Sequence, residues 1–534
     1  MKVGMAAIGV IAGMVGLSNG AEAATECSLD AIAALHVPDV SVTEAKPVAS
    51  SGSTPAHCDV QGTVVTKGAG VADGLARFAM QLPDAWQHRF LFLGVGGNAG
   101  NLRPSANAVD RASALGKGYV TVLTDTGHEG DGTSAKWTLG PDGKPDLPKR
   151  TDFFHRAAHD VTIAGKALSE AFYAGKVEHA YFDGCSTGGR MAMMEAERYP
   201  TDYEGVIAGD PMMSFHTYTA RAVVQRAALT VPAAYISPEL LKAIDARVTG
   251  RCDAIDGAKD GLVQSSAACP VRAQELICKP GETAACLNKD QARVLESYTS
   301  PFRDRRGRVV FGPWPITDMA DPQGVGYTVT GRAAPDLSDL SAPWKADPEQ
   351  EPRAWALVQE MVAHWLALGP KASVADLDVD GQTNTVGDKM LALMKKTYAE
   401  GEVRDPRKLA AFLAQGRKMI LYHGTSDPSI PPSQSIAFYN ELRQQRGSAR
   451  NAASVRLFLV PDMHHCSGGP GPDQFDTLSA LEDWVERGKP PAAIQASTRP
   501  DSPAPHRLPL CPYPQQGRFS GGGSMADPAN WQCR

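Results

Sequence analysis

The chain has 534 residues, a formal net charge of −6, and 43% hydrophobic and 21% charged residues. This composition is that of a folded protein rather than a disordered one, and the length allows a large core with an elaborate insertion. The slightly acidic balance provides no basic surface, so we expect no nucleic-acid partner.

The first 23 residues have the pattern of a signal peptide. Lys2 precedes the apolar run "VGMAAIGVIAGMVGL", and "AEAA" offers small residues for cleavage after Ala23. A membrane anchor is the alternative, but an apolar run of about 15 residues is short for a bilayer span. We therefore expect an exported protein, secreted or periplasmic, with no membrane anchor once the signal peptide is removed.

Six apolar, β-branched runs have the pattern of buried parallel strands. They cover residues 89–95, 119–125, 179–184, 204–210, 418–424 and 455–461, and helical patterns lie between them, notably at 153–175 and 190–199. The alternation predicts an α/β fold with helices on both faces of a sheet.

The alternation stops after about residue 217 and resumes near residue 417. The interval has four cysteines, many proline, glycine and aspartate residues, and weak periodicity. We interpret residues 218–416 as a lid domain inserted between two parts of the core, 24–217 and 417–534, and placed to cover the active site.

The stretch "HAYFDGCSTGG" predicts a strand, a G-x-S-x-G turn over residues 184–188, and then a helix. A sharp turn in this context presents the serine above a sheet as a nucleophile. We therefore assign Ser186 as the nucleophile, and the backbone N–H of Thr187 as an oxyanion donor at the helix start. The alternative is an ordinary glycine-rich turn.

A serine nucleophile needs a base and an acid, which in α/β-hydrolases follow it in the order acid, then histidine. Asp427 follows the predicted strand in "KMILYHGTSD", and His464 and His465 follow the next one in "VRLFLVPDMHH". Asp427 would orient the imidazole. It could instead cap a turn, and Asp462 is a rival acid that lies too close in sequence to orient the histidine comfortably.

Two cysteines adjoin these residues, because Cys185 precedes Ser186 and Cys466 follows His465. If serine and histidine meet, their neighbours can form a disulfide, which also favours His465 over His464. Such a bond closes about 280 residues, for which loop-entropy models predict about 4–5 kcal/mol. A nucleophilic Cys185 thiol is the alternative, but it would leave an odd number of cysteines in an oxidising compartment.

The chain has ten cysteines, an even number that favours a full set of disulfides in an exported protein. A zinc site would need C-x-x-C spacings, and the sequence has none. Besides Cys185–Cys466, proximity along the chain favours Cys252–Cys269, Cys278–Cys286 and Cys511–Cys533, which leaves Cys27–Cys58.

A second oxyanion donor is expected from a glycine-rich loop after an early strand. The run "RFLFLGVGGNAG" places four glycines in this position. A dinucleotide or phosphate loop is the alternative, but no acidic residue on a following strand and no G-K-[ST] supports it.

The predicted insertion contains an acidic loop, with Asp253, Asp256 and Asp260 between Cys252 and Cys269. Three carboxylates within eight residues repel each other unless a cation neutralises them, and oxygen ligands suit calcium. The spacing is not that of an EF-hand. A solvated acidic turn closed by a disulfide is the alternative.

The motifs "GCSTGGR", Asp427 and "HHC" resemble the Cys-Ser, Asp and His-Cys pattern of the tannase/feruloyl esterase family of α/β-hydrolases. The similarity extends to "DTGHEG", "AERYPTDYEGVIAGDP" and "FDTLSALEDWVERGKPPAAI", and so covers nearly the whole mature chain. It implies an α/β-hydrolase fold with a large inserted lid domain. It also implies a catalytic triad of Ser186, Asp427 and His465.

The resemblance implies further site residues. The oxyanion donors would be Thr187 and Gly97, with Gly96 as an alternative to Gly97. A structural calcium ion in the lid would bind the side chains of Asp253, Asp256 and Asp260 and the carbonyls of Ala258 and Leu262.

The activity implied is serine hydrolysis of a small aromatic ester. Hydroxycinnamoyl (feruloyl) esters are the first expectation, with galloyl esters or mono(2-hydroxyethyl) terephthalate as alternatives. Two candidates from other classes are a non-catalytic, calcium-stabilised binding protein and a metalloenzyme that uses the aspartate cluster. The complete triad argues against the former.

Substrate-binding residues are sought in the lid. Phe311, Trp314 and Tyr327 would line an apolar slot for a flat ring, or else form lid core. Arg332 would meet a substrate carboxylate or be merely exposed. Arg190, after the predicted turn, is more consistent with a structural role.

Overall fold

The computed structural model describes Met1 and residues 25–534, apart from 106–109, 265, 270, 321–323, 346, 446–450 and 452. The expected signal peptide, beyond Met1, lies outside the described residues. No helix among the described residues is long and apolar enough to cross a membrane.

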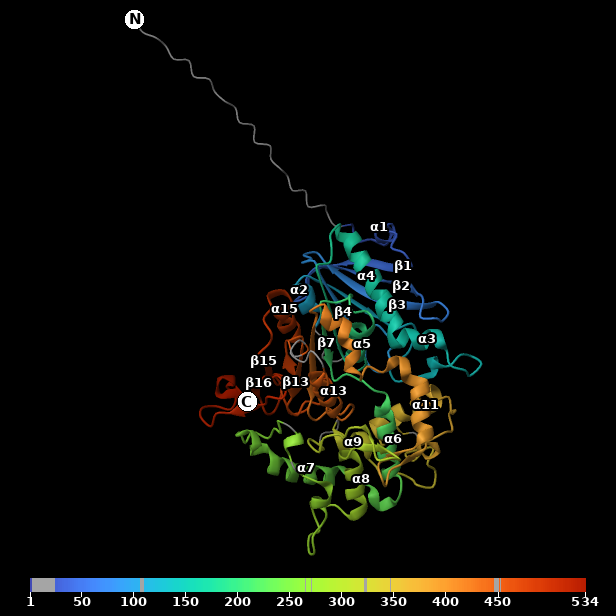
Figure 1. Cartoon of the computed structure of the whole chain (residues 1–534), viewed down its shortest axis with the longest axis vertical. Coiled ribbons are helices and arrows are strands. Elements are labelled where there is room, and N and C mark those ends of the chain that lie inside the picture. The colour runs from blue at the N-terminus through green and yellow to red at the C-terminus, as the bar shows by residue number, and fades with distance from the viewer. Residues whose placement is uncertain are drawn as a thin grey trace.

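A nine-stranded sheet forms the centre of the molecule, in the order β1-β2-β3-β5-β4-β6-β7-β12-β13 (Figure 1). The last six strands of this order are parallel. They are β5 (Tyr119–Thr124), β4 (Arg89–Leu93), β6 (His179–Cys185), β7 (Gly205–Gly209), β12 (Lys418–Gly424) and β13 (Val455–Val460). All six runs that the sequence predicted as buried strands are therefore confirmed.

Three further strands extend one edge of the sheet as antiparallel neighbours: β1 (Val40–Val48), β2 (His57–Thr66) and β3 (Gly74–Pro83). Burial alternates along β2, so that one face packs on the core and the other is more accessible. The sequence analysis did not anticipate these strands, because their alternating pattern is weaker than the continuous apolar runs of the parallel strands.

Helices cover both faces of the sheet, as predicted. Phe90 and Phe92 of β4 belong to the core cluster that includes α4 (Ala157–Tyr173) and α5 (Thr187–Arg198). Leu91 and Leu93 belong to the cluster on the other face, which includes α15 (Thr477–Arg487). The predicted helix at 153–175 begins with a π-helical turn, Asp152–Arg156, before α4.

The chain between β7 and β12 forms an insertion, residues 210–417. It carries most of the remaining helices and a small four-stranded sheet in the order β10-β11-β8-β9. Figure 1 shows α6, α7, α8 and α9 gathered at one end of the molecule, beyond the large sheet. The helices used below are α6 (His216–Ala228), α7 (Pro238–Cys252), α8 (Lys289–Thr299), α9 (Val325–Val329), α10 (Arg353–Glu360) and α11 (Asp388–Tyr398).

Candidate active site

Ser186 lies at the turn between β6 and α5 and has an unusual backbone conformation. Its φ is 63° and its ψ is −122°, in a region that residues with a side chain seldom adopt. The strained turn places the hydroxyl above the carboxyl end of the sheet. This is the strand–turn–helix geometry that the sequence predicted.

The close approach of neighbouring chains explains the glycines around this turn. A Cβ at Gly184 would lie 2.6 Å from the backbone of Gly188, and a Cβ at Gly94 would lie 2.6 Å from the Cα of Gly188. A side chain at any of these positions would therefore push the turn away from the end of β4. The sequence "GCSTGG" allows the serine loop and the loop after β4 to pack in contact.

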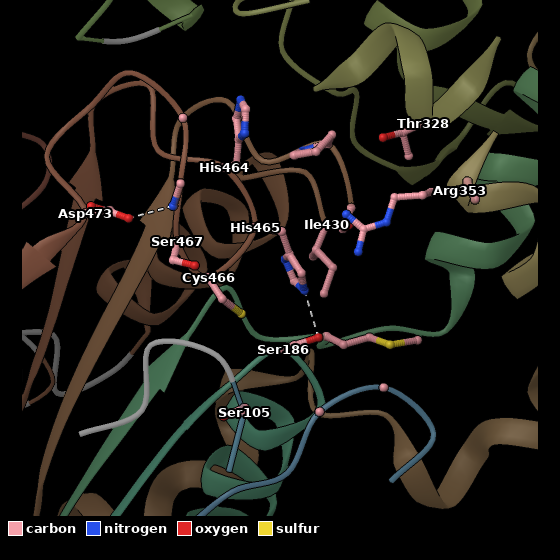
Figure 2. A pocket seen from close by; sticks show the side chains of 18 of the residues that line it. Ser105, Ser186, Thr328, Arg353, Ile430, His464, His465, Cys466, Ser467 and Asp473 are labelled. Carbon is pink, nitrogen blue, oxygen red and sulfur yellow. Dashed lines mark hydrogen bonds between the residues drawn. The ribbon is translucent and has the colours of Figure 1, made fainter. Parts of the chain in front are cut away.

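Ser186, His465 and Asp427 form a hydrogen-bonded chain. The Ser186 hydroxyl lies 2.9 Å from Nε2 of His465 (Figure 2). Nδ1 of His465 lies 2.8 Å from Oδ2 of Asp427. A neutral imidazole with its proton on Nδ1 donates to Asp427 and accepts from Ser186. The three residues follow β6, β13 and β12, whose carboxyl ends meet at this edge of the sheet.

Asp427 is fully buried and is held by several donors. Its Oδ1 accepts the backbone N–H groups of Ser429 at 2.7 Å and Ile430 at 2.9 Å. Burial would raise the pKa of Asp427, but the charge of His465 and hydrogen bonds from His423 and His465 outweigh it and hold the pKa below its usual value. The carboxylate is therefore ionised beside the imidazole.

The structure separates the two adjacent histidines. His465 points to Ser186, whereas Figure 2 shows His464 directed away from it. Nε2 of His464 contacts the carboxylate of Asp318, in the insertion. The rival acid, Asp462, is also turned away, because its carboxylate accepts the Ser426 hydroxyl at 2.7 Å.

Asp462 also connects this loop to the insertion. Its Oδ2 accepts the backbone N–H of Val263, directly after the acidic loop. The Thr317 hydroxyl lies 2.7 Å from that of Ser426. The loops that carry His465 and Asp427 are thus both hydrogen-bonded to residues 210–417.

Asp210 and His423 adjoin the triad and were not singled out by sequence analysis. Both are fully buried, and His423 lies 3.3 Å from the Asp427 carboxylate. Burial raises the pKa of Asp210 to about 6, although the nearby charge of His423 opposes the rise. The sequence did contain a signal for Asp210, because this aspartate stands at the end of a predicted strand. Asp427 was selected for a similar position after a predicted strand.

The expected oxyanion donors lie together beside the serine. Gly96, Gly97 and Thr187 line the same cavity as Ser186. Thr187 begins α5, so its N–H has no acceptor within the helix. The Thr187 hydroxyl donates to the carbonyl of Gly97 at 2.7 Å, which fixes the glycine-rich loop to the serine turn.

The cavity above the triad has a volume of about 790 Å³. Met212, Tyr218 and Leu357 contribute apolar surface to its wall, and Arg353 reaches into it from the side opposite the His465 loop (Figure 2). Other parts of the wall are polar and come from residues 464–473 and 498–503. This size is ordinary for a small-molecule site.

Comparison with known proteins identifies the family. The model of the family described as "Tannase and feruloyl esterase" matches residues 58–534. The chain belongs to the tannase and feruloyl esterase family. It is 31% identical to mono(2-hydroxyethyl) terephthalate hydrolase of Piscinibacter sakaiensis over 92% of this chain and 86% of that protein. It is 28% identical to feruloyl esterase B of Aspergillus niger over 85% and 82% of the respective chains.

Solved structures of this family have the same fold. Feruloyl esterase B from Aspergillus oryzae superposes with a TM-score of 0.75 at 22% identity, covering 94% of this chain and 98% of that one. Tannin acyl hydrolase from Aspergillus niger superposes with a TM-score of 0.73 at 20% identity, covering 96% of each. Both structures share with this chain a mixed α/β architecture around a large central sheet. Because its curated relatives are ester hydrolases, this family member is a carboxylic ester hydrolase.

The structure contains five disulfides at the five pairs expected from the sequence. Cys185 and Cys466 are bonded, with their Cα atoms 5.9 Å apart. The other four are Cys27–Cys58, Cys252–Cys269, Cys278–Cys286 and Cys511–Cys533. No cysteine is free.

The acidic loop has features that fit a cation. Oδ2 of Asp256 is buried and has no hydrogen-bond partner. Burial raises the pKa of Asp256 to about 6, and repulsion from Asp260 adds to the rise. The N–H of Ala258, which donates to Asp256, opposes it. Oδ1 of Asp253 accepts the N–H groups of Asp260 and Gly261, each at 3.0 Å, so the loop curls back on itself. An unpartnered buried carboxylate oxygen beside other carboxylates suits a calcium ion.

The expected substrate residues lie apart from Ser186. Trp314 is buried, stacks on Tyr298 with ring centroids 5.0 Å apart, and lines a small neighbouring cavity. Phe311 is buried beside Trp314, with ring centroids 5.9 Å apart. The Tyr327 side chain lies outside the described part of the chain.

Two arginines considered from the sequence also lie outside the lining of the main cavity. Arg332 is about half exposed and forms an ion pair with Glu349 at 3.5 Å. Arg190 is fully buried and donates to the carbonyls of Phe153 and Phe154, which agrees with a structural role. The arginines that line the cavity are Arg221, Arg353 and Arg499, and none of them was recognised in the sequence.

Proposed function

We propose that this protein is a serine esterase that uses Ser186, His465 and Asp427 as its catalytic triad. The hydrogen-bonded chain from the Ser186 hydroxyl through His465 to Asp427 is the observation that carries the proposal. The Ser186 hydroxyl, at one end of this series of hydrogen bonds, lines a cavity that is large enough for a small aromatic ester.

The reaction follows from this geometry. His465 Nε2 takes the proton of the Ser186 hydroxyl as the oxygen attacks the ester carbonyl. The N–H groups of Thr187 and Gly97 stabilise the oxyanion, and the imidazolium then protonates the departing alcohol. Water, activated by the same imidazole, cleaves the acyl-enzyme. Asp427 keeps the imidazole in the required tautomer and stabilises its charged form.

The first candidate substrate is a hydroxycinnamate (feruloyl) ester, and a galloyl ester is an alternative. Several relatives carry the name feruloyl esterase, and the apolar surfaces of Tyr218 and Leu357 suit a flat ring. The polar wall formed by Ser467 and residues 498–503 suits a hydroxyl-bearing alcohol. Trp314 lines a small cavity that shares Arg221, Thr328, Ala354 and Pro428 with the main one, so we assign it a supporting role.

A second candidate is an ester whose acyl group carries another carboxylate, such as mono(2-hydroxyethyl) terephthalate. The guanidinium of Arg353, which reaches into the cavity, favours it (Figure 2). A planar guanidinium binds a carboxylate through two parallel hydrogen bonds. A relative of that name is 31% identical to this chain. Arg332, the sequence candidate for this role, is less favoured because it does not line the cavity.

Three further features complete the proposal. The sheet is the core of an α/β-hydrolase fold, and residues 218–416 act as its lid. A structural calcium ion is held by Asp253, Asp256 and Asp260 and by the carbonyls of Ala258 and Leu262, outside the catalytic cavity. The protein is exported, which the five disulfides support because such bonds persist in oxidising compartments.

Ser186→Ala tests the proposal. Hydrolysis of methyl ferulate and of a chromogenic ester should fall by at least about 10⁴-fold while the melting temperature is retained. His465→Ala should have a similar effect. The imidazole of His464 faces Asp318 rather than Ser186, so the His464→Ala variant should still hydrolyse these esters. A folded Ser186→Ala variant with wild-type activity would refute the proposal. A wild-type protein that cleaves none of the esters would favour a binding protein.

A further inference from the structure

Behind the triad lies a fully buried carboxylate that the mechanism does not use. Asp210 directly follows β7, and neither it nor its neighbour His423 faces the substrate cavity. A buried carboxylate is costly unless it is well hydrogen-bonded. The partners of Asp210 therefore indicate what it does.

The Asp210 carboxylate connects two loops of the triad. Its Oδ1 accepts the N–H of Gly424 at 2.8 Å, and its Oδ2 accepts the N–H of Cys466 at 2.6 Å. Gly424 ends the strand that precedes Asp427, and Cys466 directly follows His465. One side chain thus fixes the backbone beside the acid and beside the base.

The same short segment also holds the serine turn. The carbonyl of Gly209, the residue before Asp210, accepts the N–H of Ser186 at 2.9 Å. The N–H of Met212 donates back to the carbonyl of Ser186 at 3.1 Å. Residues 209–212 therefore contact all three loops that carry the triad.

His423 lies between Asp210 and the acid of the triad. Its Nε2 is 3.3 Å from the carboxylate of Asp427, 3.6 Å from that of Asp210, and 2.8 Å from the carbonyl of Ile430. Its Nδ1 is 2.7 Å from the hydroxyl of Ser435. An imidazolium at this position reduces the repulsion between two buried carboxylates.

Among the described residues, the titratable side chains whose charges act most on Asp210 are His423, Asp427 and His465. Asp210, Asp427 and His465 each offer one atom within 4.8 Å of the others, and His423 completes the cluster. Both oxygens of Asp210 already accept a backbone N–H, so the carboxylate is hydrogen-bonded within the protein.

We propose that Asp210 is a positioning residue for ester hydrolysis: its carboxylate holds the acid strand and the histidine loop against the serine turn, and His423 neutralises the pair formed with Asp427. This inference rests on the proposed function. It adds a residue that touches no substrate atom and acts through His465 and Asp427.

Asp210→Asn is the direct test. An amide has one acceptor oxygen, and its NH₂ group would face the second N–H donor, so one loop loses its hydrogen bond. Loss of a buried hydrogen bond at this point should lower kcat by about ten- to a hundredfold, with KM nearly unchanged. The acid limb of the kcat/KM profile should also move to lower pH, because the imidazolium form of His465 loses a nearby negative charge.

A matched variant separates positioning from general destabilisation. Asp152 is equally buried, but it binds Arg156 and Thr66 far along the chain from the triad residues. Asp152→Asn should lower the melting temperature and leave the pH profile in place. If Asp210→Asn behaves in the same way, with kcat within about twofold of wild type, the positioning role is wrong. That result would leave the proposed function intact, since Ser186→Ala tests it separately.

His423→Gln provides a second test if Asp210→Asn does not fold. It removes the charge between the carboxylates but keeps both N–H bonds to Asp210. Repulsion between Asp210 and Asp427 should then favour protonation of the pair, and the acid limb of kcat/KM should move to higher pH, opposite to Asp210→Asn. An unchanged acid limb in folded His423→Gln protein would overturn the proposed arrangement.

Discussion

Cys185 and Cys466 form a disulfide that joins the residue before Ser186 to the residue after His465. Their Cα atoms are 5.9 Å apart although 281 positions separate them in sequence. The proposed nucleophile and its proposed base therefore belong to loops that are covalently linked. No other disulfide of the protein involves a neighbour of the triad.

Removing this bond should affect both stability and turnover. In the loop-entropy model, the Cys185→Ser/Cys466→Ser double variant loses about 5 kcal/mol of unfolding free energy. A folded fraction should also have lower kcat, because the Ser186–His465 contact is less constrained. Denaturant unfolding and ester hydrolysis at low temperature measure the two effects.

The disulfide between Cys278 and Cys286 provides the matched control. Its sequence separation is only 8 and it lies in the insertion. The corresponding double serine variant should lose about 2–3 kcal/mol by the same model and keep its kcat. Equal effects of the two variants on kcat would show that the Cys185–Cys466 bond contributes nothing specific to catalysis.

Calcium should stabilise the protein through the acidic loop. At a calcium concentration a hundred times its Kd, binding adds about 2.7 kcal/mol to the free energy of unfolding. Chelation should therefore lower the melting temperature, and Asp256→Asn should abolish the calcium response. Calorimetry with and without calcium measures the shift.

Two controls define this calcium effect. Asp388→Asn, at an exposed position of α11, should keep the full calcium response. Activity should survive chelation at temperatures where the fold persists. Loss of turnover in the folded, chelated protein would instead support the metalloenzyme alternative.

Arg353 should discriminate between acidic and neutral acyl groups. Arg353→Leu removes one of the three arginines that line the cavity and leaves Arg221 and Arg499 in place. If Arg353 binds the second carboxylate, kcat/KM for mono(2-hydroxyethyl) terephthalate should fall by about ten- to a hundredfold, as for the loss of a charged hydrogen-bond partner. The kcat/KM values for methyl ferulate and methyl gallate, which carry no second carboxylate, should change by less than about threefold.

Arg332→Leu is the control for this experiment. Arg332 pairs with Glu349 and does not line the cavity, so the substrate panel should be unchanged. If Arg332→Leu, but not Arg353→Leu, selectively loses activity towards the terephthalate ester, the carboxylate-binding role belongs to Arg332, the residue chosen from the sequence.

Three buried histidines should make the fold sensitive to acid. Burial lowers the pKa of His128 to about 4, of His216 to about 4, and of His155 to about 3. These side chains stay neutral in the folded protein but bind protons near pH 6.5 when unfolded. Their contribution to stability is therefore complete above pH 6.5 and is lost as the pH falls towards 4.

The loss should reach about 3 kcal/mol per histidine by pH 4. Urea unfolding between pH 7 and pH 4 measures it, and His128→Gln should make the curve less steep. His36→Asn, at an exposed histidine, should leave the slope unchanged. A wild-type stability that stays constant over this range would contradict the prediction.

Much of the core was predictable because its parallel strands are buried on both faces. A strand such as β6 is a continuous apolar run, and the G-x-S-x-G turn that follows it needs glycine wherever backbones touch. These are local constraints, and they leave a local signal in the sequence. The three residues of the proposed triad drew attention in the sequence because each follows such a strand.

The remaining site residues depend on contacts between distant segments. Asp210 resembles any aspartate after a strand, and its role is visible only when the N–H groups of Gly424 and Cys466 meet it. Arg353 lies in a segment of weak periodicity, so nothing in the sequence indicates that its side chain enters the cavity. Trp314, the aromatic candidate for substrate binding, is buried and lines the neighbouring cavity rather than the one above Ser186.

The contacts of the Asp427 and His465 loops with residues 210–417 limit how this enzyme can be re-engineered. Val263, Thr317 and Asp318 bond to side chains that lie within four residues of a triad member. A graft of this segment from a relative would bring foreign partners to Ser426, Asp462 and His464. Changing the substrate range by exchanging whole insertions therefore requires residues 425–427 and 462–466 to be transplanted together with the donor segment.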